Sequence, residues 1–225
     1  MSEAKCRQIP FNGAMIRAIL DGRKTQTRRV VRPQPSDLRW EGDIYVRPLT
    51  SSHDWPLYYW QRRGPSWFAS DPLRCPYGQP GDLLWVRATW AEIWDDNTTD
   101  DEGAIEPYIE YRADSENPYP GEWPPDEARG NPDAPKWRAS IHMPRWASRI
   151  TLRVTDVRIE RVQDTSEDDA RAEGVTLNPS PVHRISCYRL AFNLLWDSIY
   201  AERGDSWLSN PWVWVIEFER VEAEQ

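Results

Sequence analysis

The sequence has 225 residues and a formal net charge of −8, an acidic balance that excludes a generic nucleic-acid coat protein, which would be basic. Its length favours one large domain and suffices for a substantial buried core. Fourteen Trp and nine Tyr stand against four Phe, and twenty Pro supply many points at which regular secondary structure must end.

The acidic charge is concentrated in one segment of the chain. Residues 95–133 contain thirteen Asp or Glu and two Arg, a local net charge of −11, so the rest of the chain carries +3. Charge runs of this kind usually form solvated surface, and we expect a Pro-rich surface insertion here with one short strand at 108–112. The remainder is a mildly basic body.

The three cysteines, Cys6, Cys75 and Cys187, are widely spaced and form no C-x-x-C motif. They predict neither a disulfide framework nor a zinc site, so we expect no metal ion, no cofactor and a reducing compartment. The sequence has no signal peptide and no apolar run of membrane-spanning length. These features predict a cytoplasmic protein that does not bind a membrane.

The first predicted elements are a short strand at residues 8–11 and a helix from Asn12, a favourable N-cap residue, to Leu20. Apolar side chains at spacings of three and four form one face of this helix. Gly22 stands where a helix C-terminus places its left-handed residue. The chain then extends as a second strand over residues 25–31.

The junction between this helix and strand, residues 22–29, is dense in polar groups. Residues 23–32 hold five cations and two threonine hydroxyls: Arg23, Lys24, Thr25, Thr27, Arg28, Arg29 and Arg32. A cluster of this composition is able to bind a phosphate and to perform chemistry on a group held beside it. We therefore take the junction as the first candidate site.

Residues 33–80 show little periodicity and much Pro, Trp and Tyr, which predicts a long ordered insertion. Its aromatic residues are candidates for a lid that stacks on bases: Trp55, Tyr58, Tyr59, Trp60 and Trp67. Alternating apolar residues over 83–93 predict one central strand, in which Trp85 and Trp90 belong to the core. A second insertion covers residues 94–136.

The chain regains regular structure after the second insertion. A turn at residues 143–148 offers Arg145 and Trp146 as contacts for nucleic acid. The apolar pattern of a long strand at 149–162 changes phase at Thr155-Asp156. A one-residue change of phase predicts a β-bulge, which bends a strand.

The last predicted elements are two helices and a strand. Ser166-Glu167-Asp168-Asp169 is a capping box that opens a short helix, and Gly174 ends that helix. A longer helix at residues 186–201 and an alternating strand at 212–221 follow. The strand closes the regular part of the chain.

These elements amount to five or six strands and three helices, without repeated β–α units or a Gly-rich nucleotide loop. The pattern predicts an α+β fold in which a small, strongly bent sheet closes into a mixed β-barrel. We expect a single domain over residues 1–225. Its core would lie in residues 8–32, 81–93 and 137–221, with insertions at 33–80 and 94–136.

Several segments together resemble the ASCH domain, a family of the PUA-like superfamily of small β-barrels. They are Gly22-Arg23-Lys24-Thr25-Gln26-Thr27-Arg28-Arg29 after a short helix, Gly81-Asp82 before a strand, the Ser166 helix and a C-terminal Val-Ile-Glu-Phe strand. With its Trp- and Pro-rich insertions, the chain is most similar to the long ASCH proteins of phages and prophages. The resemblance implies a cleft for RNA or a nucleotide, lined by the junction.

One branch of this family, the bacterial N4-acetylcytidine amidohydrolases, implies roles for individual residues. Matched by motif position, Thr27 would be the nucleophile or water-positioning group, Lys24 its activator and Glu173 the proton shuttle. The candidate contacts for substrate or nucleic acid are Arg23, Thr25, Arg28, Arg29, Arg145 and Trp146.

The implied chemistry places demands on these residues. A threonine hydroxyl is a poor nucleophile unless a base takes its proton, and a lysine is such a base only when burial or nearby cations lower its pKa. An ion pair with Glu173 would raise the same pKa. Moreover, Lys24 and Thr27 point to opposite faces of a regular strand, so they share a site only if Lys24 lies in the turn or a bulge intervenes.

Other functions stay open on the sequence alone. One alternative is a non-catalytic RNA-binding module or a ribonuclease, since other ASCH proteins have been implicated in RNA cleavage. A different alternative is a phage protein that binds a host protein through residues 95–133.

Overall fold

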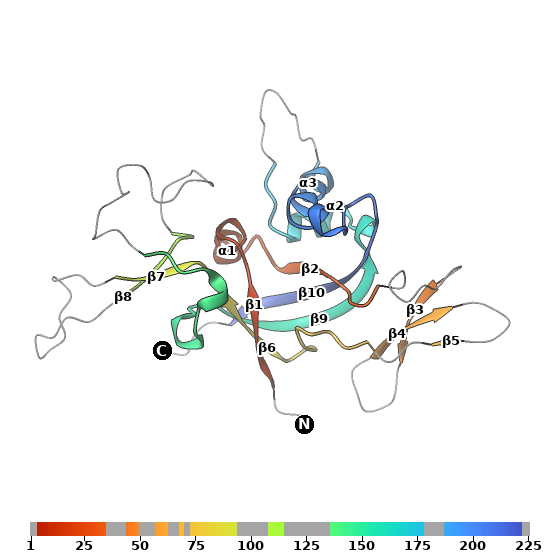
Figure 1. Ribbon diagram of the computed structural model, residues 1–225, viewed down its shortest axis with the longest axis horizontal. Coiled ribbons are helices and arrows are strands. Elements are labelled where there is room, and N and C mark those ends of the chain that lie inside the picture. Colours follow the sequence, from red (N-terminus) through yellow and green to blue (C-terminus); the bar gives the residue numbers. More distant parts are fainter. Residues whose placement is uncertain are drawn as a thin grey trace, which may run out of the picture.

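A strongly curved five-stranded sheet organises the fold (Figure 1). The computed structural model describes residues 4–34, 44–49, 57–62, 68–69, 73–93, 108–114, 136–177 and 187–221. The strands of the sheet, in spatial order, are β1 (Cys6–Pro10), β6 (Leu83–Arg87), β9 (Thr151–Arg161), β10 (Trp212–Val221) and β2 (Gln26–Val30). β1 runs parallel to β6 and the other neighbours are antiparallel, so the sheet is mixed.

Two smaller sheets accompany it. They are formed by β3 (Ile44–Leu49), β4 (Leu57–Arg62) and β5 (Phe68–Ala69), and by β7 (Trp90–Ile93) with β8 (Tyr108–Tyr111). β8 confirms the short strand predicted in the acidic segment. The first small sheet lies in the insertion at 33–80, where periodicity predicted no strand. Pro48 lies in its edge strand β3, where a residue without a backbone N–H is tolerated.

The single strand predicted over residues 83–93 is wrong, because the structure divides it into β6 and β7. β6 is central, as expected, since it lies between β1 and β9. Its pairing with β9 ends at Trp85, opposite Thr151, and its pairing with β1 ends at Arg87. Beyond Arg87 no strand among the described residues continues the ladder of the main sheet, and the chain pairs instead with β8.

The described residues contain three α-helices, so the fold is α+β as predicted. The helices are α1 (Gly13–Leu20), α2 (Glu167–Ala172) and α3 (Tyr188–Tyr200), and the 3-10 turns are η3 (Ser140–His142), η4 (Arg145–Ala147), η5 (Val162–Asp164) and η6 (Ala201–Arg203). The side chain of Asn12 accepts a hydrogen bond from the Met15 N–H at 2.9 Å, which confirms this N-cap. Ser166 and Asp169 form the predicted capping box at α2.

The predicted β-bulge is present in β9. Asp156 lies opposite Glu217 and Val154 lies opposite Phe218, so Thr155 is the additional residue. The shift lets alternate side chains on both sides of the bulge face the same core. It accompanies the bend of β9 and β10 in Figure 1.

β10 separates two hydrophobic cores. The residues that pack with α1, β1 and β6 are Trp214, Ile216 and Phe218, and those that pack with α3 are Val213 and Val215. In the β2–β10 register Thr27 lies opposite Ile216, whereas Arg28 lies opposite Val215. Alternate residues of β2 are thereby directed to different sides of the sheet, which positions the junction between the two cores.

Candidate functional site

The chain leaves α1 through the predicted left-handed turn. Gly22 has a φ of +72° directly after Asp21, which caps the helix, and glycine adopts this conformation without steric cost. Lys24 lies in the turn, ahead of β2, and forms an isolated antiparallel bridge with Glu173. Because Lys24 precedes β2, the direction of its side chain does not follow the alternation of side chains along that strand.

Lys24 is a buried cation with three fixed acceptors. Only 2% of its surface is exposed. Its Nζ donates to Glu173 Oε2 at 2.6 Å, to the Glu173 carbonyl at 3.0 Å and to the Gln26 carbonyl at 2.8 Å. Because an ammonium has three protons, all of its donors are occupied in this conformation.

Glu173 and Arg28 complete a cluster of buried charges with Lys24, which we call the inner cluster. Glu173 caps the C-terminus of α2, and its Oε1 accepts from Arg28 Nη1 at 3.2 Å. The Arg28 side chain is fully buried and also donates to Glu160 Oε1, from Nε at 3.0 Å and from Nη2 at 2.5 Å. Two cations thus hold both oxygens of one buried carboxylate.

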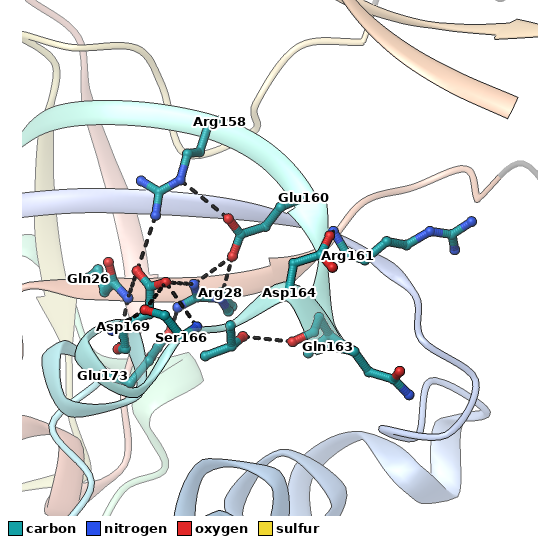
Figure 2. A network of polar contacts seen from close by, with 12 residues as sticks. Gln26, Arg28, Arg158, Glu160, Arg161, Gln163, Asp164, Ser166, Asp169 and Glu173 are labelled. Atoms are coloured by element: carbon teal, nitrogen blue, oxygen red, sulfur yellow. Dashed lines mark hydrogen bonds and ion pairs between the residues drawn. The ribbon is translucent and has the colours of Figure 1, made fainter. Parts of the chain in front are cut away.

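Partly exposed residues surround the inner cluster and extend the network to solvent (Figure 2). Arg158 forms ion pairs with Glu160, Asp169 and Glu217. Gln26 donates from Nε2 to Asp169 Oδ1 at 3.1 Å. The buried charges therefore belong to a network that links β2, β9 and β10 to α2.

Burial lowers the pKa of Lys24 from its ordinary value. The ion pair and hydrogen bond with Glu173 act in the opposite direction, while Arg29 and Arg28 add to the lowering. From the sequence alone, either burial or the ion pair with Glu173 could dominate the pKa of Lys24. In the structure the lowering by burial is the larger effect. A buried lysine with a lowered pKa is the form of this residue that is able to serve as a base.

Asp169 gives the network a specific response to acid. Burial opposes its ionisation, but hydrogen bonds from Ser166 and Gln26 and the charge of Arg28 lower its pKa to about 2. A carboxyl group with a depressed pKa in the folded state stabilises the protein above its unfolded pKa of about 4, and this contribution disappears as the pH falls through about 2.

We therefore expect Asp169→Asn to lower the free energy of unfolding by about 1 kcal/mol at neutral pH and to have little effect at pH about 2. Urea denaturation of both proteins across this acid range measures the difference. A difference that stays constant with pH would contradict the assignment. Asp168→Asn is the matched control, because Asp168 precedes Asp169 in α2 and forms no ion pair within the described part of the chain.

Thr27 lies on the face of β2 opposite to Arg28. It is buried opposite Ile216, in the core beneath α1. Its hydroxyl forms no hydrogen bond with any residue that the structure describes. Of the three residues that the resemblance implies as catalytic, the fold brings Lys24 and Glu173 into contact. Lys24 Nζ also lies 5.6 Å from the centroid of the Phe11 ring, which belongs to the same core as Ile216, the residue opposite Thr27.

The other candidate residues of the junction have different environments. Arg23 is exposed and donates to the Asp21 carboxylate and to the Gly174 carbonyl, whereas Thr25 is exposed and its side chain has no hydrogen-bond partner among the described residues. Arg29 donates from Nη2 to the Pro10 carbonyl at 2.6 Å. Arg28, by contrast, is the buried partner of Glu173.

The remaining candidates, Arg145 and Trp146, lie in η4 and belong to a different surface. Arg145 is exposed and donates to Thr151 Oγ1 at 3.3 Å. Trp146 is 68% exposed and meets the buried Trp90 edge to face. The structure therefore does not bring these two residues into the inner cluster.

A surface pocket of about 600 Å³ lies beside the junction. Its lining includes Gly22, Arg23 and Thr25 from the junction and Arg171 and Tyr188 from the two helices. This volume lies within the range of small-molecule sites. The aromatic ring and two guanidinium groups are suited to a base and a phosphate, and neither Lys24 nor Glu173 is part of the lining.

The sequence reasoning missed the residues that connect the inner cluster to solvent. Arg158 and Glu160 alternate on β9, and this spacing shows that they share a face but not which element covers it. The sequence patterns identified Gln26 only as a residue of a strand and Asp169 only as a residue of a capping box. Their convergence depends on the position of α2 over β2, which no local pattern specifies.

Most of the acidic insertion lies outside the described residues, as do Trp55 and Trp67 of the predicted aromatic lid. Tyr58, Tyr59 and Trp60 belong to β4. The Tyr58 hydroxyl donates to the Val157 carbonyl at 2.9 Å, and its ring meets Trp214 edge to face at 5.5 Å. Tyr58 is thus engaged with the main sheet. Of residues 95–133, the structure describes only 108–114.

Comparison with known proteins adds no assignment, because no protein-family model, curated protein or solved structure matches the chain. Within the described ranges, no group of three or more His, Cys, Asp or Glu is placed to hold a metal ion. No helix in the same ranges has the length and apolar character needed to cross a membrane.

Proposed function

We propose that the chain is an ASCH-type protein of the PUA-like superfamily that binds RNA or a modified nucleoside beside the junction. The curved mixed sheet supports the proposal, as do its edge strands β1 and β2, which are joined in sequence by α1. Arg29 spans these edges by donating to the Pro10 carbonyl. In this proposal the contact closes a small barrel without backbone pairing.

The observation that carries the proposal is the inner cluster. A buried ion pair contributes little net stability, since desolvation offsets most of the attraction between the charges. The presence of Lys24 and Glu173 at a fully buried position therefore favours a role in function. Perturbed titratable groups of this kind concentrate at sites of proton transfer.

We further propose that the reaction is hydrolysis of an N4-acylated cytidine. Water adds to the acyl carbonyl carbon, the bond between that carbon and N4 breaks, and a carboxylic acid and cytidine leave. The Lys24–Glu173 pair would accept a proton from water and return one to N4. Because the Thr27 hydroxyl has no partner among the described residues that would take its proton, the proposal assigns the attack to water.

The pocket beside the junction is the proposed binding position for the nucleoside. Tyr188 offers an aromatic surface to a base, and Arg171, which lies over that ring at 5.6 Å, would move to a phosphate when a base stacks there. Arg23 would exchange its partner Asp21 for the phosphate, and Asp168 in the lining would accept from a donor of the base. Lys24 forms the backbone bridge behind this pocket. Its Nζ must release one of its two carbonyl acceptors to reach a bound substrate.

The direct test is incubation of the purified protein with N4-acetylcytidine, with cytidine release followed by chromatography. We expect release by the wild type and a loss of at least about a hundredfold in Lys24→Met, as removal of a general base gives. Arg153→Gln is the control, because Arg153 pairs with Glu219 on the surface, outside the pocket. If the wild type releases no cytidine, the hydrolase proposal is wrong.

One observation favours a second function, that of a non-catalytic nucleoside-binding module. All three protons of Lys24 are occupied and its side chain is fully buried, as in a structural pair. This alternative predicts binding of N4-acetylcytidine without hydrolysis. Isothermal titration with Arg23→Gln tests it, since weaker binding by this variant would place the ligand in the pocket.

A further inference from the structure

The outer face of β1, β6 and β9 presents an indole ring flanked by arginines. The inward residues of these strands are buried in the core: Ile9, Leu84, Val86 and Leu152. Trp85 alternates with these residues and is half-buried, packing in part against the core, with Gln8 opposite it on β1 and Thr151 opposite it on β9. The ring therefore lies at the middle of a row that crosses three strands.

Arg87 and Arg145 lie over this ring in cation–π contacts, with guanidinium carbons 5.8 and 5.9 Å from its centroid, where a base would displace a guanidinium or stack beside it. Arg87 donates to the Ser140 carbonyl and to Gln8 Oε1, and Arg145 donates to Thr151 Oγ1. All of these acceptors are neutral, and neither arginine forms an ion pair within the described ranges. Arg153, on the same strand as Thr151, is instead paired with Glu219 at 2.9 Å.

The same face is hollowed. A depression of about 590 Å³ is lined by Trp85, Arg87 and Gln8 together with Tyr77. Two aromatic side chains and an arginine with neutral partners thus share one concave surface. Trp146 adds an exposed indole next to Arg145 in the chain.

We propose that a single-stranded nucleic acid binds across this face, which we call the Trp85 face. Bases would stack on Trp85, and phosphates would contact Arg87 and Arg145. Stacking on aromatic side chains tolerates any base, and arginines without carboxylate partners supply the complementary charge. Exposed aromatics on a sheet surface are a recurring means of binding unpaired bases.

The Trp85 face is distinct from the pocket beside the junction, because the two sets of lining residues do not overlap. Arg29 lies at the edge of the depression, donating to the Pro10 carbonyl with its guanidinium 5.8 Å from the centroid of the Tyr77 ring. Pro10 and Tyr77 both line the depression. The inference rests on the proposed function for the class of ligand alone and assigns a second surface, away from the junction, to a nucleic-acid strand.

The test is fluorescence anisotropy with labelled oligouridylate and oligodeoxythymidylate. We expect Trp85→Leu to weaken binding by about tenfold, the size of a lost stacking contact, and Trp85→Phe to retain most of the affinity. Arg145→Gln should weaken binding and reduce the slope of log affinity against log salt by about one. The more tightly bound oligomer identifies whether the natural strand is RNA or DNA.

Arg153→Gln is the matched control, because it removes an arginine of the same sheet that already has a carboxylate partner. An effect equal to that of Arg145→Gln would overturn the proposal, as would absence of binding by the wild type. Displacement by polyglutamate at equal charge would indicate an acidic protein ligand and would also overturn it. Circular dichroism melting confirms that each variant is folded.

The assay separates this inference from the proposed function. Variants of the Trp85 face should leave cytidine release and nucleoside binding unchanged. Oligomer binding that depends on Trp85 supports the inference even when N4-acetylcytidine is not hydrolysed. Loss of nucleoside binding in Trp85→Leu would contradict the separation of the two sites.

Discussion

We expect Glu173→Ala to lower the free energy of unfolding by about 3–5 kcal/mol, the cost typical of leaving a buried charge without its partner. Glu173 occupies the centre of the inner cluster, where one oxygen accepts from Lys24 at 2.6 Å and the other from Arg28 at 3.2 Å. The variant leaves the fully buried ammonium with carbonyl acceptors alone. Urea denaturation at neutral pH measures the loss.

A double-mutant cycle separates the ion pair from the packing around it. Lys24→Met removes the buried ammonium and leaves Glu173 with Arg28, so this variant should lose less stability than Glu173→Ala. Once the ammonium is absent, removal of the carboxylate should matter less. We expect a coupling energy of about 2 kcal/mol, and additive losses would contradict a coupled pair.

The elements that the sequence predicted well are those whose cause is local. Asn12 and Ser166 cap helices through atoms three residues away, and Gly22 has a backbone conformation that favours glycine. The β-bulge at Thr155 follows from a phase change between neighbouring apolar residues. In each case the information lies within a few residues of the structure that it specifies.

The predictions that failed or stayed incomplete depend on distant partners. The end of β6 at Arg87 depends on where β1 and β9 stop beside it. The core into which Thr27 points depends on the register between β2 and β10, since that register directs Thr27 into the core beneath α1. Local periodicity contains neither of these facts.

Glu173 also shows that local sequence patterns predict an element but not its distant contacts. Its position as a helix-end residue was evident from the capping box and Gly174, but its contact with Lys24 joins residues 149 positions apart. A family resemblance supplied the expectation that they meet. The physical reason for the contact is the bridge between the turn after α1 and the end of α2.

Gly174→Ala should be among the most destabilising single-methyl additions in the chain. Gly174 has a φ of +82°, and a Cβ built there would lie 2.8 Å from both Ala18 Cβ and Lys24 Cβ. The left-handed conformation costs about 1–2 kcal/mol for alanine, and the overlap adds about 1–3 kcal/mol. We therefore expect a loss of about 3 kcal/mol in urea denaturation.

Gly204→Ala distinguishes the overlap from the backbone cost. Gly204 has nearly the same φ, +85°, but a Cβ there meets no atom within 4 Å. This variant should lose only the backbone contribution. Adding Ala18→Gly to Gly174→Ala removes one of the two overlapping carbons and should recover part of the excess loss. Equal losses in Gly174→Ala and Gly204→Ala would mean that α2 moves freely away from the turn, so that the bridge between Lys24 and Glu173 does not hold the inner cluster in place.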